Sequence, residues 1–253
     1  MKETRILFSG ISGRMGKATR AAAEGSSEYK IVAGIDVVPA VDTIPIYQNP
    51  DDVNVDVDAI IDFSHHTATP KLLEFAIAKN LPVVVCTTGH NDEETALIHE
   101  AAKKIPVFFS RNMSIGINLL IELTKKAAAI LGEDFDIEIV EKHHNKKLDA
   151  PSGTALMIAD AIADTVDYDA EYTYERQSRR EARKKTEIGI SSVRGGTIVG
   201  EHEVMFCGAD EIISVSHSAA SRDVFARGAL RAAAYICGKP AGFYDMSTMI
   251  AGE

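Results

Sequence analysis

Residues 4–23 read Thr-Arg-Ile-Leu-Phe-Ser-Gly-Ile-Ser-Gly-Arg-Met-Gly-Lys-Ala-Thr-Arg-Ala-Ala-Ala. The pattern predicts a short buried strand over 4–8, a glycine-rich turn over 10–16 and a helix from Lys17. Glycines at a strand-to-helix turn let the main chain approach a pyrophosphate, whose charge then lies at the helix N-terminus. A turn with a purely structural role is the alternative. The predicted cofactor contacts in this turn are Gly10, Ile11, Ser12, Gly13, Arg14 and Met15.

A carboxylate follows the next predicted strand, residues 29–35. This residue, Asp36, lies about 20 residues beyond the glycines, where nucleotide-binding units place an acid for the ribose hydroxyls. Val37 and Val38 come next, so no basic residue stands there to receive a 2′-phosphate. Because a carboxylate repels a phosphate, we predict NADH or NADPH as cofactor with NADH favoured. Arg14 could still supply a phosphate contact.

Strands and helices alternate through the rest of the first half. Predicted strands cover 58–63, 81–86 and 106–109, and predicted helices cover 69–79 and 91–104. Such alternation makes a parallel sheet, in which ligands lie beyond the carboxyl ends of the strands. Two loops at such ends are therefore candidates for nicotinamide contacts, with ordinary turns as the alternative. Their residues are Cys86, Thr87, Thr88, Ser110, Arg111, Asn112 and Met113.

The pattern changes in the second half of the chain. A long helix is predicted over 114–131, and an alanine-rich helix over 222–237. Residues 172–185 are densely charged, and we predict a solvated or mobile loop there. Consecutive strands without crossover helices favour an antiparallel or mixed sheet and mark a second domain. The runs that predict these strands are 188–193, 197–206 and 211–217.

Residues 141–154, Glu-Lys-His-His-Asn-Lys-Lys-Leu-Asp-Ala-Pro-Ser-Gly-Thr, join a predicted strand to a predicted helix. Two histidines and two lysines lie at the strand exit, and Ser152-Gly153-Thr154 lies at the helix N-terminus, which favours anions. Imidazole transfers protons near neutral pH, and a nearby ammonium favours its neutral form. The stretch therefore indicates acid–base chemistry on an anionic substrate. The alternative is a basic surface loop with Ser152 or Thr154 as a helix cap.

Composition narrows the class of protein. The chain has 253 residues and a net charge of −10, from 27 basic and 37 acidic residues. That balance argues against nucleic-acid binding, which needs clustered lysine and arginine. Three scattered cysteines, and the pair His65–His66 without further ligands at suitable spacing, predict no metal site. The first apolar run is too short for a signal or membrane segment, so we expect a cytoplasmic protein without a membrane partner.

Residues 141–155 resemble the signature of the 4-hydroxy-tetrahydrodipicolinate reductase (dihydrodipicolinate reductase) family. That signature is Glu-x-His-His-x-x-Lys-x-Asp-x-Pro-Ser-Gly-Thr-Ala, and every fixed position is filled. The spacing Gly-x-x-Gly-x-x-Gly departs from the commoner Gly-x-Gly-x-x-Gly but is similar to the family's turn. Residues 194–202 are close to a second family pattern. The chain departs from the family at Cys86, where the family has glycine, and at Arg111.

The resemblance covers essentially the whole chain and implies an α/β protein of two domains. A Rossmann-type parallel-sheet nucleotide-binding domain would span 1–113 and 222–253. An α+β substrate-binding and oligomerisation domain with a mixed sheet would span 114–221, and the family is typically a homotetramer. The implied reaction is NAD(P)H-dependent reduction of 4-hydroxy-tetrahydrodipicolinate, a small dicarboxylate, in the diaminopimelate route to lysine. Hydride reaches ring C4 and water is lost.

The motif also implies residue roles. His143 is the expected proton donor and acceptor, and Lys147 the second catalytic group, whereas Lys146 occupies a variable position. Three other readings stay open: another two-domain dehydrogenase, a nucleotide-binding redox regulator without turnover, and an interaction surface. The residues expected to hold the substrate are His144, Ser152, Gly153 and Thr154.

Overall fold

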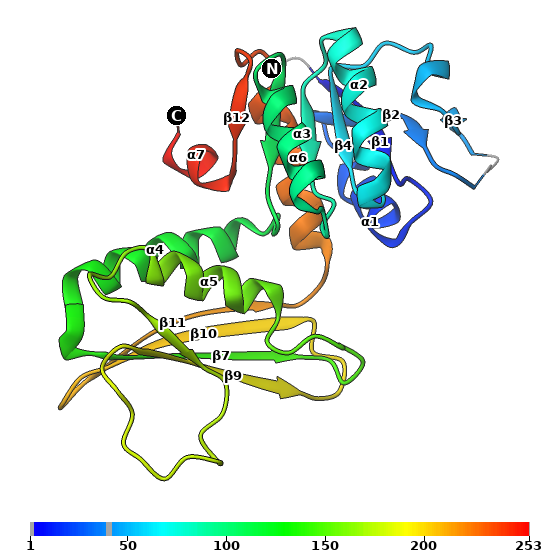
Figure 1. Ribbon diagram of the computed structural model, residues 1–253. Helices are drawn as coiled ribbons and strands as arrows, with labels where there is room; N and C mark the ends of the chain where they lie inside the picture. The colour runs from blue at the N-terminus through cyan, green and yellow to red at the C-terminus, as the bar shows by residue number, and fades with distance from the viewer. Residues whose placement is uncertain (1–2, 39–41, 253) are drawn as a thin grey trace. The chain divides into compact units, whose positions relative to one another are not determined.

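A computed structural model describes residues 3–38 and 42–252 (Figure 1). The chain packs into two compact units, one formed by 1–115 with 222–253 and the other by 116–221. Residues 1, 2 and 253, at the ends of the predicted first domain, lie outside the described residues. The assignment of one domain to the cofactor and of the other to substrate and assembly stays a prediction.

The first unit is built on a seven-stranded sheet in which every paired strand runs parallel. The strand order is β12-β6-β5-β4-β1-β2-β3, so sequence order reverses beside β1, as in the Rossmann fold. The predicted parallel sheet is confirmed; β12 is a strand that the sequence did not predict. The strands are β1 (Thr4–Ser9), β2 (Tyr29–Ile35), β3 (Ile46–Tyr47), β4 (Ala59–Asp62), β5 (Val83–Val85), β6 (Pro106–Phe109) and β12 (Gly242–Tyr244).

Apolar side chains on both faces of this sheet bury it between helices. Ile6 and Phe8 of β1 pack with α1 and α6, while Leu7 packs with α2 and α3 on the other face. This alternation follows from the two-residue period of a strand, and a sheet covered on both faces is apolar throughout. The helices of the unit are α1 (Arg14–Ala23), α2 (Thr69–Lys79), α3 (Asp92–Ala102), α6 (Asp223–Ile236) and α7 (Met246–Ala251), with 3₁₀ turns η1 (Pro50–Asp52) and η2 (His66–Ala68).

Glycine is required where β1 turns into α1. Gly10 has φ +82°, and a Cβ there would lie 2.7 Å from the Phe63 carbonyl oxygen, at the end of β4. A Cβ on Gly16 would lie 2.1 Å from the carbonyl oxygen of Ile11. The turn therefore fits tightly between the ends of two neighbouring strands, which is the switch point of the sheet where ligands bind in such folds.

The second unit carries a five-stranded sheet in the order β11-β10-β7-β9-β8. β10 is antiparallel to β7 and β11, whereas β9 is parallel to β7 and β8, which confirms the mixed sheet. Helices α4 (Ile115–Leu131) and α5 (Gly153–Ala163) lie together on one face (Figure 1). The strands are β7 (Asp136–His143), β8 (Glu171–Thr173), β9 (Glu187–Arg194), β10 (Gly200–Cys207) and β11 (Ile212–Ala219), with the 3₁₀ turn η3 (Gly132–Asp134).

The prediction of a solvated or mobile loop over 172–185 is wrong in part. Tyr172 and Thr173 belong to β8. The residues that follow, 174–185, form a mostly exposed loop as predicted, but Arg176, Arg179 and Arg183 are paired. Arg176 donates to Glu138 (2.8 Å) and binds Glu187, whose side chain is only 2 % exposed. Arg183, also largely buried, lies 2.6 Å from Asp136. Acidic side chains on two strands hold the segment, and charge density alone does not reveal such partners.

Candidate active site

A cavity of about 620 Å³ lies in the first unit, beside the carboxyl ends of β1, β2 and β4. Gly10, Ser12, Gly13 and Asp36, which the sequence predicted as cofactor contacts, all line it. The other lining residues are Ser9, Ile35, Val37, Val38, Gln48, Pro50, Phe63, Ser64, His65, Thr67, Ala68, Lys71 and Leu72.

The Asp36 carboxylate is bound to the main chain on both sides. Its Oδ2 accepts from the Ser12 amide (2.9 Å) and its Oδ1 from the Val38 amide (3.2 Å). The acid therefore ties the end of β2 to the glycine-rich turn. Gly13 caps α1 without a side-chain hydrogen bond, so the helix offers its N-terminus to an anion. The space, the close backbone approach and the carboxylate fit a dinucleotide.

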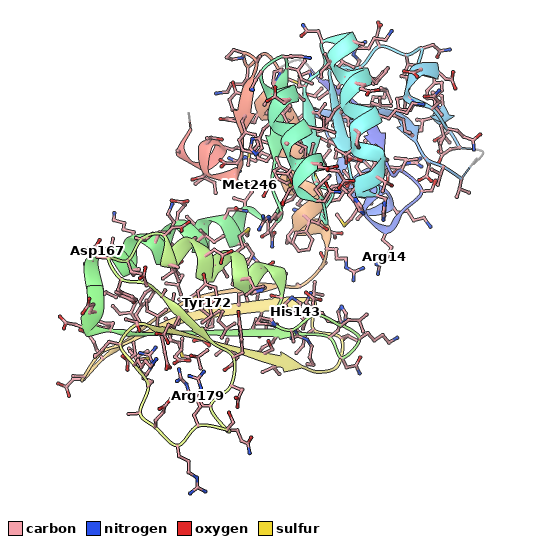
Figure 2. The ribbon with its side chains drawn as sticks, in the orientation of Figure 1. Arg14, His143, Asp167, Tyr172, Arg179 and Met246 are labelled. Atoms are coloured by element: carbon pink, nitrogen blue, oxygen red, sulfur yellow. The ribbon has the colours of Figure 1, made fainter. Side chains whose placement is uncertain are left out.

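The other predicted residues of the turn lie outside the lining of this cavity. Ile11 is buried in the core, and Met15 is half-buried in the first turn of α1. Arg14 begins that helix and is exposed, so its guanidinium is available to a phosphate (Figure 2).

The two predicted nicotinamide loops follow β5 and β6, at the expected edge of the sheet. Cys86 and Met113 pack in the core, so either residue could reach a cofactor only through its main chain. Burial raises the pKa of the Cys86 thiol well above its ordinary value. The Thr87 hydroxyl donates to the buried carboxylate of Asp62 (3.0 Å).

Within the second of these loops, the polar side chains bind their own backbone. The Ser110 hydroxyl donates to the Asn112 carbonyl (2.8 Å), and the Asn112 side chain accepts from the Ser114 amide (2.9 Å). Thr88 and Arg111 are exposed. None of the seven residues of these two loops lines the 620 Å³ cavity.

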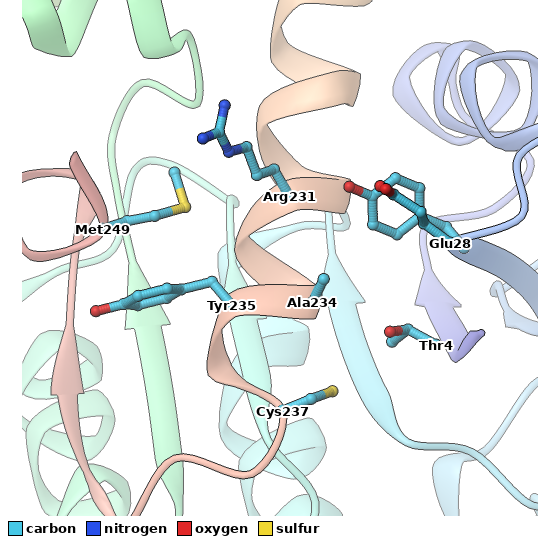
Figure 3. Close-up of a pocket in the computed structure, with 8 residues that line it drawn as sticks. Thr4, Glu28, Arg231, Ala234, Tyr235, Cys237 and Met249 are labelled. Carbon is cyan, nitrogen blue, oxygen red and sulfur yellow. The ribbon is translucent and has the colours of Figure 1, made fainter. Parts of the chain in front are cut away.

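A second cavity in the first unit lies at the amino ends of β1 and β2 (Figure 3). Arg231 and Tyr235 of α6 line it with Glu28 and Met249. Ligands of such sheets bind at the opposite, carboxyl edge, so we do not include this cavity in the candidate site.

The second unit centres on a buried carboxylate, Glu141, at the end of β7. Its side chain is fully buried, and its two oxygens accept hydrogen bonds from the two terminal nitrogens of Arg194, each at 2.7 Å. Its Oε1 also accepts from the Ser152 amide (3.0 Å), and its Oε2 lies 2.6 Å from Nδ1 of His143. His143 ends β7 and is 12 % exposed (Figure 2).

These contacts determine the protonation of Glu141 and of Nδ1 of His143. Burial by itself would raise the pKa of Glu141, but hydrogen bonds from Arg194 and its other donors lower it to about 2. An ionised carboxylate only accepts, so Nδ1 of His143 carries the proton of that bond. Burial lowers the pKa of His143 below its ordinary value, although the hydrogen bond and charge of Glu141 oppose this shift.

The predicted substrate and catalytic residues around this centre come from one segment. The Lys147 amide donates to the His144 carbonyl (3.1 Å), which folds the loop back on itself. The Lys147 ammonium, largely buried, lies 2.9 Å from Asp149. Nδ1 of His144 is buried and has no hydrogen-bond partner among the described residues. A ligand acceptor could satisfy it.

The helix that follows begins as the sequence indicated. Ser152 is its N-cap, and its hydroxyl accepts from the Ala155 amide (3.1 Å). Ser152 is thus the helix cap that the alternative interpretation proposed, and its predicted contact with substrate stays a prediction. A Cβ on Gly153 would meet no atom within 4 Å, so the space beside this positive helix end is open.

Sequence reasoning did not assign three residues of this cluster: Glu141 as a buried anchor, Arg194 as its partner, and His202. Nε2 of His202 lies 3.1 Å from the Ser152 hydroxyl, and its ring is 5.3 Å from that of His143. The signal for Glu141 was present, because it continues the inward alternation of Ile137 and Ile139. In the first unit, Lys71 of the 620 Å³ cavity was likewise not assigned.

The glycine-rich turn, the parallel sheet and Asp36 define a dinucleotide-binding protein of the dehydrogenase class. The family model described as "Dihydrodipicolinate reductase, N-terminus" matches residues 4–113, and the model described as "Dihydrodipicolinate reductase, C-terminus" matches 116–250. The chain belongs to the dihydrodipicolinate reductase family, as the sequence indicated.

Curated relatives match the chain over nearly its full length. The 4-hydroxy-tetrahydrodipicolinate reductase of Caldanaerobacter subterraneus subsp. tengcongensis is 50 % identical over 97 % of this chain and 98 % of its own. The reductase of the same name from Clostridium novyi is 47 % identical over 98 % of each chain.

Solved structures share the fold. A dipicolinate-bound dihydrodipicolinate reductase from Paenisporosarcina sp. TG-14 has a TM-score of 0.81 at 23 % identity, covering 96 % of this chain and 97 % of its own. A diaminopimelate (DAP) dehydrogenase from C. glutamicum in complex with DAP has a TM-score of 0.58 at 13 % identity, covering 97 % and 93 %. In the residues that the structure describes, no helix has the length and apolar character to cross a membrane.

Stability should fall in mild acid because of His202. Burial lowers its pKa from 6.5 to about 4, and the neighbouring His143 adds to this shift. A folded-state pKa below the unfolded value means that stability is fully present above pH 6.5 and is lost as pH falls toward 4. The loss amounts to about 3 kcal/mol.

Urea unfolding measured from pH 7.5 to 4 checks this prediction. The variant His202→Gln should show a shallower decline than the unmodified protein, and His99→Gln, at an exposed position on α3, should show the same decline as the unmodified protein. Equal slopes for His202→Gln and the unmodified protein would contradict the assignment.

Proposed function

We propose that this chain catalyses NAD(P)H-dependent reduction of 4-hydroxy-tetrahydrodipicolinate to tetrahydrodipicolinate, in lysine biosynthesis through diaminopimelate. The overall reaction consumes one hydride and one proton and releases water. The observation that carries the proposal is the complete 141–155 signature, in which His143 binds a buried carboxylate and Lys147 lies near enough for its charge to lower the pKa of His143. Near-full-length relatives bearing this name support it.

His143 is the proposed proton-transfer group, and Nε2 is its working atom. Nδ1 is held by Glu141 (2.6 Å), so only Nε2 remains to exchange a proton with substrate. Lys147 is the proposed second catalytic group, because its ammonium donates protons and attracts a dianionic substrate. Asp149 holds that ammonium (2.9 Å) at the turn that also carries His144.

The substrate carboxylates are proposed to bind at His144 and at the N-terminus of α5. The unpartnered Nδ1 of His144 and the open helix end at Gly153 support this proposal. Thr154, in the first turn, extends the same positive end. Ser152 contributes by setting the position of the helix through its cap.

The cofactor is proposed to lie at the carboxyl edge of the parallel sheet, with its pyrophosphate on the 10–15 turn. When bound, the nicotinamide supplies the hydride. Two residues of this chain are proposed to bind and orient it: Asp36, which lines the cavity, through the ribose hydroxyls, and the exposed Arg14 through a phosphate. The main chain of the 86–88 and 110–113 loops is proposed to contact the nicotinamide.

The proposed reaction is tested by following nicotinamide absorbance after mixing protein, NADH and freshly formed substrate. His143→Ala and Lys147→Ala should each lower kcat by ~10²–10⁴-fold, since each removes a positioned proton-transfer group. NADH affinity, measured by fluorescence, should change little.

Lys146→Ala is the matched control, because this neighbouring lysine is exposed. It should keep normal turnover. Absorbance that stays constant in the unmodified protein would support a regulator instead. Near-normal kcat in both the His143 and Lys147 variants would reject the residue roles.

NADH is proposed to be the preferred cofactor. Asp36 lies in the cavity with both oxygens bound to backbone amides, so a 2′-phosphate would meet a fixed negative charge. Lys71 lines the same cavity with a half-exposed side chain, which leaves room for some NADPH use.

Asp36→Asn should raise the KM for NADH and lower that for NADPH, because it removes the negative charge and replaces one of the two acceptor oxygens by a donor. Steady-state kinetics with each cofactor measure the change, and Asp56→Asn, at an exposed acid 92 % accessible, is the control. An unchanged ratio of kcat/KM for the two cofactors would remove Asp36 from the explanation.

Assembly into a homotetramer through the second unit is also proposed. Both helices of that unit lie on one face of its sheet, and the apolar side chains Val193 and Ile212 are exposed, at 44 % and 65 %. Light scattering should give about four times the chain mass of 27.3 kDa. A monomeric mass at micromolar concentration would exclude it.

A further inference from the structure

We infer that Glu141, locked by Arg194, is a positioning residue that holds His143 with its proton on Nδ1 and leaves Nε2 free for the reaction. The inference rests on the role of His143 proposed above and deepens it.

Four donors bind the Glu141 carboxylate directly, and the Ser192 hydroxyl on the neighbouring strand helps to lower its pKa. Oε2 accepts from one Arg194 nitrogen (2.7 Å) and from Nδ1 of His143 (2.6 Å). Oε1 accepts from the other Arg194 nitrogen (2.7 Å) and from the Ser152 amide (3.0 Å). A fully buried carboxylate with four donors is ionised, and its bond to His143 therefore requires a proton on Nδ1.

Arg194 is itself fixed, so the carboxylate cannot rotate away. Its guanidinium also donates to the carbonyls of Val193 (2.8 Å) and Asp149 (2.7 Å). The planar fork of an arginine matches a carboxylate in one orientation only. The carbonyls of Val193 and Asp149 thus fix Arg194, and Arg194 fixes the orientation of Glu141. Glu141 in turn sets the orientation of the His143 ring.

The opposite edge of the His143 ring is left uncrowded by a glycine. A Cβ on Gly200 would lie 3.2 Å from Nε2 and 3.6 Å from Cδ2 of His143. Since Gly200 has no side chain, Nε2 keeps room for a substrate atom. One edge of the imidazole is therefore anchored and the other is kept open.

An amide in place of the carboxylate should reverse the tautomer. In Glu141→Gln, an amide NH₂ at the Oε1 position would face the Ser152 amide, which can only donate. At the Oε2 position it would face Nδ1 of His143, which can accept if its proton moves to Nε2. Each orientation loses one hydrogen bond from Arg194. The second is favoured because the first sets two donors against each other at Ser152. In the second orientation the proton of His143 moves from Nδ1 to Nε2.

Nitrogen-15 NMR of histidine-labelled protein reads this tautomer directly, without any turnover. In the unmodified protein at pH 7.5, His143 should show a protonated Nδ1 and an unprotonated Nε2, with signals identified by their loss in His143→Ala. In Glu141→Gln the two assignments should exchange. A protonated Nε2 in the unmodified protein would overturn the inference, whether or not the variant folds.

Kinetics test whether Glu141 acts through His143. Glu141→Gln should lower kcat by ~10²–10⁴-fold, as expected when an imidazole presents the wrong nitrogen. In the His143→Ala background the same substitution should cause less than about a twofold further loss, because its target is gone. Glu201→Gln, at a half-exposed acid paired with Lys142 (3.1 Å), is the matched control and should keep normal kcat.

The outcomes separate the inference from the proposed function. A full additional loss in the double variant would assign Glu141 a structural role only and overturn the inference. Normal turnover in His143→Ala would instead reject the proposed role of His143, while the NMR result would still decide the tautomer.

Discussion

The ion pair between Glu141 and Arg194 is the interaction on which the second unit depends. Its carboxylate meets the end of β7, the start of α5 and, through Arg194, the end of β9 and the carbonyl of Asp149. Removing one partner of a buried pair commonly costs about 3–5 kcal/mol, because the other charge is left uncompensated. The same contact that orders the fold also orients His143, so stability and chemistry share one side chain.

Local patterns predicted most elements, and distant partnerships were not visible. The helix over 69–79 is confirmed at both ends, and the alternation at Ile137 and Ile139 predicted β7. Glu141 follows in the same inward register, so its burial was accessible to the same reasoning. Its partner lies 53 residues away, and no periodicity specifies that distance. The position of His202 beside Ser152, 50 residues apart, arises in the same way.

In the first unit, the sequence predicted several residues of the cavity at the switch point of the sheet but not its full lining. Strand–helix alternation implies a parallel sheet, and the glycines and Asp36 mark its switch point. Lys71 was missed because it belongs to a helix that looks ordinary in sequence and reaches the cavity only after folding. The ion pairs of Arg176 and Arg183 were not predicted for the corresponding reason: their acidic partners lie on two strands, β7 and β9.

The hydrogen bond from the Ser12 amide to Asp36 affects how a nucleotide would bind. The turn proposed to bind the phosphates is tethered to the acid proposed to bind the ribose, so these two parts of the cavity are held together without a ligand. Little loop entropy is then lost on association, and we expect binding to a preformed site with little conformational change.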